Sequence, residues 1–221
     1  MKIRITEIVP KVFQVAFDTQ YDLCMTFVRL QEYYESPEFK GKHFTLEEYM
    51  DWWSEHYGHG SFDYPSRWSG FNVPGKVYYN WQDLFRELRP KEKILVEALN
   101  KRIIKKGYDF HDVYVIGCYK GKRKKEVVRH ELAHAMYALY PDYQESCDKL
   151  IAEFKEDDEG LDAYGFAHNS LIRMGYCDDV IEDEVQAYFS TNDNEFGTLI
   201  CREQFVKHYE EFKEKLKNDN N

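Results

Sequence analysis

His130, Glu131 and His134 form the pattern HExxH near the middle of the chain. Residues 126–140 have the composition of a helix, and positions four apart lie on the same face of an α-helix. Both imidazoles can therefore bind one metal ion, while Glu131 reaches a water on that ion. Zn²⁺ held by two histidines keeps a coordination position open for water, as hydrolysis requires. We predict a zinc site with His130 and His134 as ligands and Glu131 as the general base.

The rest of this segment suits a helix that packs against a core. Its apolar positions are Val127, Val128, Leu132, Ala135, Met136 and Leu139. Such a helix can be buried on one side and still direct both histidines toward a cleft. The alternative is an exposed helix in which the two histidines and the glutamate coincide by chance.

With this motif the chain resembles the zincins, a large clan of HExxH zinc metallopeptidases. The metzincin subgroup extends the motif to HExxHxxGxxH, but Tyr137 and Tyr140 replace its glycine and third histidine. Gluzincins take a glutamate from a later helix, in several families written ExxA, and Glu184 to Ala187 match that pattern. The resemblance to gluzincins implies Glu184 as the third zinc ligand.

The third ligand is less specific than the histidine pair. Acidic residues crowd positions 178–184, where negative charge at a helix start is favourable without any metal. Glu182, His168 or no third protein ligand remain alternatives to Glu184. Some gluzincins place an aspartate after the alanine; Tyr188 stands there in this chain, so the partner of the first histidine is not identified.

Composition narrows the class of protein. The chain has 221 residues, with 40 acidic and 30 basic side chains and a net charge of −10, which argues against nucleic acid as a partner. Five widely spaced cysteines indicate reduced thiols and a cytoplasmic location. No segment approaches the roughly 18 apolar residues of a membrane span. The sequence does not indicate an oligomeric state.

We expect one zincin-like domain over residues 1–221, of the α+β class and mostly helical. Residues 1–89 would contribute strands, helices and an aromatic loop, and residues 90–221 the metallopeptidase core. Two strands broken at Pro10 are expected near the N-terminus, and another at 113–118. Helices are expected at 20–34, 45–57, 90–106, 126–140, 143–155, 161–174, 179–190 and 203–217, with an acidic linker at 156–160.

The strand at 113–118 directly precedes the HExxH helix. In the zincins that this order resembles, such a strand lies at the edge of a small mixed sheet and borders the cleft. A free strand edge can hydrogen-bond a peptide backbone as an added strand. The resemblance therefore implies a polypeptide substrate bound in extended form.

Two further segments have open interpretations. The aromatic-rich residues 61–75 either line a cleft or pack over the core as a compact loop. The basic residues within 120–125 are best explained as a solvated turn, with a patch that attracts an acidic partner or nucleic acid as the alternative.

The chemistry of the HExxH residues and the resemblance to zincins together predict a zinc-dependent metallopeptidase. Four residues are candidates for stabilising the oxyanion, and the sequence does not rank them: Tyr188, Tyr143, His168 and Arg173. One alternative is a non-catalytic protein-interaction module with the zincin fold, although it would have no use for Glu131. Another is a metal-dependent hydrolase that acts on a substrate other than peptide.

Overall fold

The computed structural model describes residues 1–121, 124–174, 180–191 and 202–218. Two compact units make up the chain, Met1–Val128 and Arg129–Asn221, and their boundary falls inside helix α6 (Lys124–Leu139). The expectation of one domain subdivided at residue 90 stays a prediction. Several positions used in the sequence analysis lie outside the described residues: Lys122, Arg123, Gly175, Cys177, Asp178, Asp179 and Cys201.

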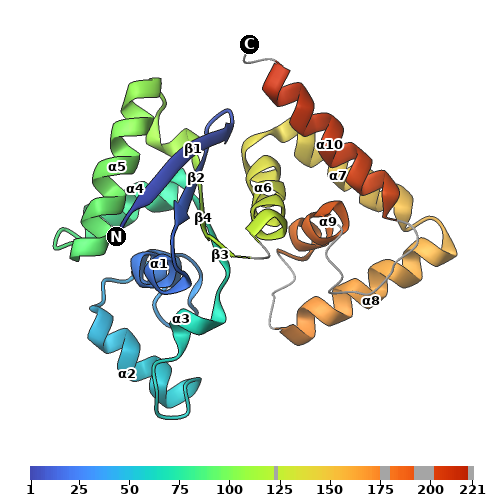
Figure 1. Cartoon of the computed structure of the whole chain (residues 1–221). Helices are drawn as coiled ribbons and strands as arrows, with labels where there is room; N and C mark the ends of the chain where they lie inside the picture. Colours follow the sequence, from blue (N-terminus) through green and yellow to red (C-terminus); the bar gives the residue numbers. More distant parts are fainter. Residues whose placement is uncertain (122–123, 175–179, 192–201, 219–221) are drawn as a thin grey trace. The chain divides into compact units, whose positions relative to one another are not determined.

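The first unit contains a four-stranded mixed sheet (Figure 1). Its strands are β1 (Ile3–Val9), β2 (Val12–Phe17), β3 (Gly70–Pro74) and β4 (Tyr114–Tyr119), in the order β1-β2-β4-β3. β1 and β2 form a hairpin around Pro10, β2 is parallel to β4, and β4 is antiparallel to β3. The predicted α+β class, mostly helical with a small mixed sheet, is confirmed.

The predicted edge position of the strand before the HExxH helix is wrong, because β4 pairs on both sides. All six of its residues are in register with β2, and five of them are also in register with β3. β4 is buried from Tyr114 to Cys118, as expected of an interior strand, which reads as a nearly continuous apolar run. The edge strands of this sheet are β1 and β3.

The aromatic segment 61–75 is the reason for this error. It contains a short helix, α3 (Tyr64–Arg67), followed by β3, in which Phe71 and Val73 are buried on either side of Asn72. The Tyr114 hydroxyl donates to Oδ1 of Asn72 at 2.7 Å across the β3–β4 pair. Part of this segment therefore packs in the core as a strand of the sheet and not as the expected compact loop, while Trp68 is 44% exposed. The alternative that the segment lines a cleft stays a prediction.

The remaining helices of the first unit are α1 (Gln20–Glu35), α2 (Leu46–His56), α4 (Gly75–Leu84), α5 (Pro90–Lys106) and the 3-10 turn η1 (Phe110–Asp112). Local signals set several of their ends. Thr45 and Glu48 form the expected capping box of α2, and Gly107 ends α5 in the left-handed conformation at φ 69°. The sequence analysis did not foresee α4.

A buried ion pair joins two of these helices. The Arg29 side chain on α1 donates from Nε to Oε1 of Glu92 at 2.8 Å, and its Nη2 also contacts that carboxylate. Both side chains are almost completely buried, at 4% and 0% exposure. Each charge compensates the other in a region where water cannot.

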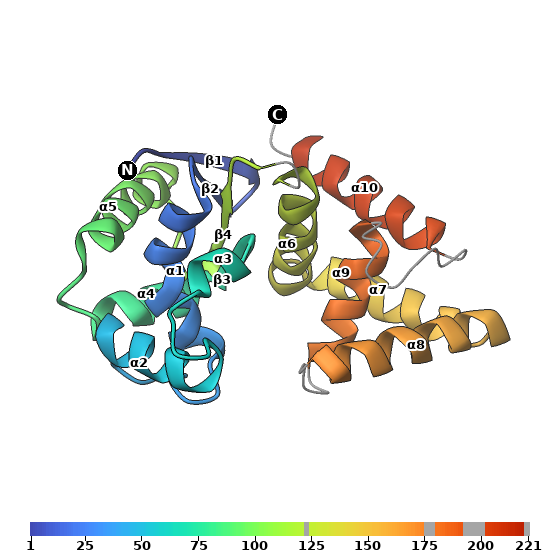
Figure 2. The same cartoon turned by 60° about the horizontal axis from the view of Figure 1, so that its bottom comes forward.

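The second unit is all helical in its described part and is built around α9 (Ile181–Thr191). It further comprises most of α6, α7 (Pro141–Phe154), α8 (Asp158–Met174) and α10 (Glu203–Asn218). α9 contacts α7, α8 and α10, and in both overall views it lies between α6 and α8 (Figures 1 and 2). Its last seven residues are all buried, so α9 is the central helix of this unit.

The expected acidic linker is only partly a linker. Asp158 and Glu159 belong to the first turn of α8, where negative charge is favourable. Gly160 follows them at a close approach, because a Cβ there would lie 1.9 Å from the carbonyl oxygen of Phe154. The turn between α7 and α8 is therefore shorter than residues 156–160.

Within the described ranges, no helix combines the length and the apolar character needed to cross a bilayer.

Replacing Glu92 with alanine should lower the free energy of unfolding by about 3–5 kcal/mol, because it leaves Arg29 buried without a counter-charge. Urea denaturation measures this loss. The matched control is Glu38→Ala, which breaks the solvent-exposed pair with Lys42 and should cost about 0–1 kcal/mol. Equal losses in the two variants would contradict this account of the buried pair.

Candidate metal centre

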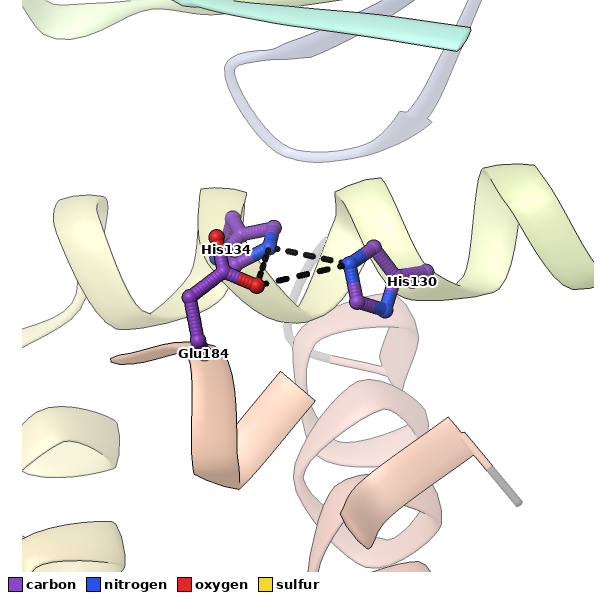
Figure 3. Close-up of side chains that lie close together, drawn as sticks. All are labelled: His130, His134 and Glu184. Carbon is purple, nitrogen blue, oxygen red and sulfur yellow. Dashed lines mark hydrogen bonds and ion pairs between the residues drawn. The ribbon is translucent and has the colours of Figure 1, made fainter. Parts of the chain in front are cut away.

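Helix α6 places the two histidines of the HExxH motif one turn apart on one face. Their Nε2 atoms lie 3.2 Å from each other (Figure 3). Leu132, Ala133 and Ala135, between and beside them in the sequence, are buried, so this turn of α6 is largely shielded from solvent. The His130 and His134 side chains are only 16% and 6% exposed.

Glu184, in the first turn of α9, faces this histidine pair (Figure 3). Its Oε2 lies 3.9 Å from Nε2 of His130 and 3.7 Å from Nε2 of His134. Among the described residues, these three form the group of His, Cys, Asp or Glu side chains whose donor atoms could hold one metal ion. The structure thus brings together all three residues that the sequence analysis named as ligands.

The spacing of the three donor atoms suits zinc. Ligands bound at about 2.0–2.1 Å in tetrahedral geometry are roughly 3.3–3.4 Å apart. The observed separations of 3.2, 3.7 and 3.9 Å lie close to this value. Two imidazole nitrogens and one carboxylate oxygen are also a donor set that zinc accepts, with a fourth position for water.

Glu182, the main alternative to Glu184, is engaged elsewhere. Its Oε1 accepts hydrogen bonds from Nζ of Lys155 at 3.2 Å and from the hydroxyl of Tyr164 at 3.0 Å. Lys155 is the residue that caps the C-terminus of α7, and Tyr164 belongs to α8. Glu182 therefore stabilises contacts of α9 with its neighbours, and neither it nor His168 belongs to the three-residue group.

Asp183 supports His134, a role that the sequence analysis missed. Nδ1 of His134 lies 3.0 Å from Oδ1 of Asp183, which also accepts a hydrogen bond from Nε2 of Gln186 at 2.9 Å. Gln186 is fully buried and in turn accepts from the Tyr143 hydroxyl at 3.3 Å. A carboxylate on Nδ1 fixes the imidazole so that Nε2 faces the other donors. In the sequence, the signal for this role is the position of Asp183 directly before Glu184, but favourable charge at a helix start explains an aspartate there equally well.

The aromatic candidates for stabilising the oxyanion differ in what their side chains contact. Tyr188 lies against His130 with ring centroids 4.6 Å apart, and the Tyr143 hydroxyl is used by Gln186. The ring of His168 lies 6.0 Å from that of Tyr164. Of these three aromatic side chains, Tyr188 is the one in ring contact with a residue of the candidate site.

Glu131 is half-buried on α6 beside His130. Its negative charge is among the causes that raise the pKa of His134, so its carboxylate shares the electrostatic environment of the site. Its role as general base stays a prediction from the HExxH pattern.

Arg129 anchors α6 immediately before the motif. Its Nη1 forms an ion pair with Glu210 of α10 at 2.8 Å, and its Nη2 donates to the carbonyl oxygen of Ser190 on α9 at 3.2 Å. The Tyr209 hydroxyl donates to the Arg129 carbonyl oxygen at 3.3 Å. The side chain and the backbone of Arg129 thus connect the start of the motif to helices α9 and α10.

The two histidines have opposite pKa shifts. Burial, together with the neighbouring His134, lowers the pKa of His130 to about 3. Burial would also lower the pKa of His134, but the carboxylates of Asp183 and Glu184 outweigh it and raise this pKa to about 10. The raised pKa favours a proton on His134 and the lowered pKa favours a neutral His130, and the Nε2 atoms of the two rings lie 3.2 Å apart.

These shifts predict how the stability of the metal-free protein depends on pH. From the ordinary value of 6.5, the lowered pKa of His130 makes stability fall as pH drops toward about 3. The raised pKa of His134 supplies stability that is present below 6.5 and lost as pH rises through about 10. The pair should therefore favour the folded state most near pH 6.5.

Urea unfolding of chelator-treated protein across this pH range tests the prediction. The difference in unfolding free energy between wild type and the double variant His130→Gln, His134→Gln should peak near pH 6.5. His168→Gln, outside the three-residue group, should keep the wild-type profile. A difference that does not change with pH would refute the opposite shifts.

Comparison with known proteins found no match for this chain, neither to a family model, nor to a curated protein, nor to a solved structure.

Proposed function

We propose that this chain is a zinc-dependent metallopeptidase of the gluzincin type. One observation carries the proposal: Glu184, which lies 50 residues after His134 in sequence, has its carboxylate facing both motif histidines. A third ligand at this place is what the resemblance to gluzincins implies. Glu131 beside the pair adds the base that a purely structural zinc site does not need.

Each residue has a distinct role in the proposed reaction. His130, His134 and Glu184 hold the metal, and Asp183 keeps Nε2 of His134 directed at it. Bound zinc supplies a Lewis acid for the substrate carbonyl and makes water a nucleophile at neutral pH. Glu131 accepts the proton of the attacking water and can return it to the leaving amine.

The substrate class rests on the resemblance alone. The expected free edge of β4 would have supported an extended polypeptide, but β4 is an interior strand. A polypeptide substrate, with no nucleic acid as partner, agrees with the HExxH chemistry and the net charge of −10. A cytoplasmic location agrees with the cysteines, since Cys24, Cys118 and Cys147 are buried and are not joined in disulfides.

Metal analysis of the purified protein tests the ligand set. Wild type and Glu182→Ala should each bind one equivalent of zinc, whereas Glu184→Ala should lose it, because of these two glutamates Glu184 is the one grouped with the histidines. Glu182→Ala is a matched control: it removes the same side chain two residues away on α9. A wild-type protein that takes up no zinc would refute the proposed function.

The role of Glu131 is tested with Glu131→Gln on a peptide library. The variant should bind zinc as wild type does and lose about 10²–10⁴-fold in turnover, since it cannot accept the proton. Glu126→Gln, an exposed glutamate in the first turn of the same helix, should keep full activity. Binding of a partner protein with no cleavage by wild type would instead favour the non-catalytic interaction module.

A further inference from the structure

The two histidines of the candidate site are not held in the same way. His134 has the Asp183 carboxylate on its Nδ1 at 3.0 Å. Nδ1 of His130 is buried, and it has no hydrogen-bond partner within the ranges that the structure describes. Metal-binding histidines ordinarily donate this second N–H to a carboxylate, a carbonyl or water, which sets the direction of the ring. Packing against the imidazole ring is a second way to set its direction.

The side chain packed against His130 is Tyr188. The two rings meet edge to face, with centroids 4.6 Å apart and an angle of 62° between their planes. Tyr188 is 8% exposed, so this contact lies inside the unit. Aromatic rings attract each other in this geometry because the positive edge of one faces the negative face of the other.

Tyr188 reaches this place through the same helix that supplies the carboxylate ligand. It follows Glu184 by four residues on α9, so both side chains lie on one face of the helix. Phe189, the next residue, lies on another face and packs against Phe154 and Phe205. The approach of α9 to α6 therefore delivers a ligand for the metal and a ring for His130 together.

We propose that Tyr188 is a positioning residue of the metal site. Its ring holds the imidazole of His130 with Nε2 toward His134 and Glu184, as the Asp183 carboxylate does for His134. This inference rests on the proposed zinc site. The observed contact with His130 is between rings, so the positioning role requires an aromatic ring at position 188.

The test compares Tyr188→Phe with Tyr188→Leu. Zinc affinity is measured by competition with a chromogenic chelator, and ligand geometry by the visible spectrum of the Co²⁺-loaded protein. Tyr188→Phe should match wild type in both. Tyr188→Leu should bind zinc about 10–100-fold more weakly and give an altered Co²⁺ spectrum, because His130 is no longer fixed.

Phe189→Leu is the matched control for loss of a buried ring. Phe189 is fully buried on the same helix, so this variant should lose stability. Its zinc affinity and Co²⁺ spectrum should nevertheless remain those of wild type. Circular dichroism is used to check that each variant folds. If Tyr188→Leu does not fold, Tyr188→Met takes its place, because a methionine fills the space with a flexible side chain.

Three outcomes would contradict either the positioning role of Tyr188 or the proposed function, and they can be told apart. Wild-type affinity and spectrum in the folded Tyr188→Leu or Tyr188→Met variant would overturn the positioning role alone. Equal weakening in Tyr188→Phe and Tyr188→Leu would overturn it too, because the hydroxyl would then be the group that matters. A wild-type protein without zinc affinity would overturn the proposed function, and the positioning role with it.

Discussion

The close approach of α9 to α6 is the constraint on which the candidate site depends. Two histidines from one helix and a glutamate from another must bring their donor atoms within about 4 Å of each other in a nearly buried space. Charges are costly there unless an opposite charge or a hydrogen bond compensates them. The ion pairs of His134 with Asp183 and Glu184 provide this compensation.

The rest of the second unit maintains that approach. α9 is the central helix, and its buried residues pack against α7, α8 and α10. Ala187, one turn after Glu184, has a small side chain, which allows a neighbouring helix to approach closely. Arg129 connects the start of the motif to Ser190 of α9 and to Glu210 of α10. The packing that stabilises this unit is thus also the packing that sets the geometry of the site.

Local signals predicted most elements of the fold well. The hairpin around Pro10, the capping box of α2 and the helix from Pro90 to Gly107 all follow from nearby residues. The sequence analysis failed where pairing partners are distant. It described residues 61–75 as a loop, but β3 forms there by pairing with β4, more than 40 residues later. That pairing is also what makes β4 an interior strand.

Helical periodicity by itself determined that His130 and His134 share a face, because the four-residue spacing leaves no other arrangement on α6. Only the tertiary structure places Glu184, and not Glu182 or His168, in one group with the two histidines, since the direction of α9 relative to α6 depends on packing across the whole unit. It also assigned Asp183 to His134 and Tyr188 to His130. Spacing within one helix is set by backbone geometry, whereas a contact between two helices is set by every side chain that lies between them.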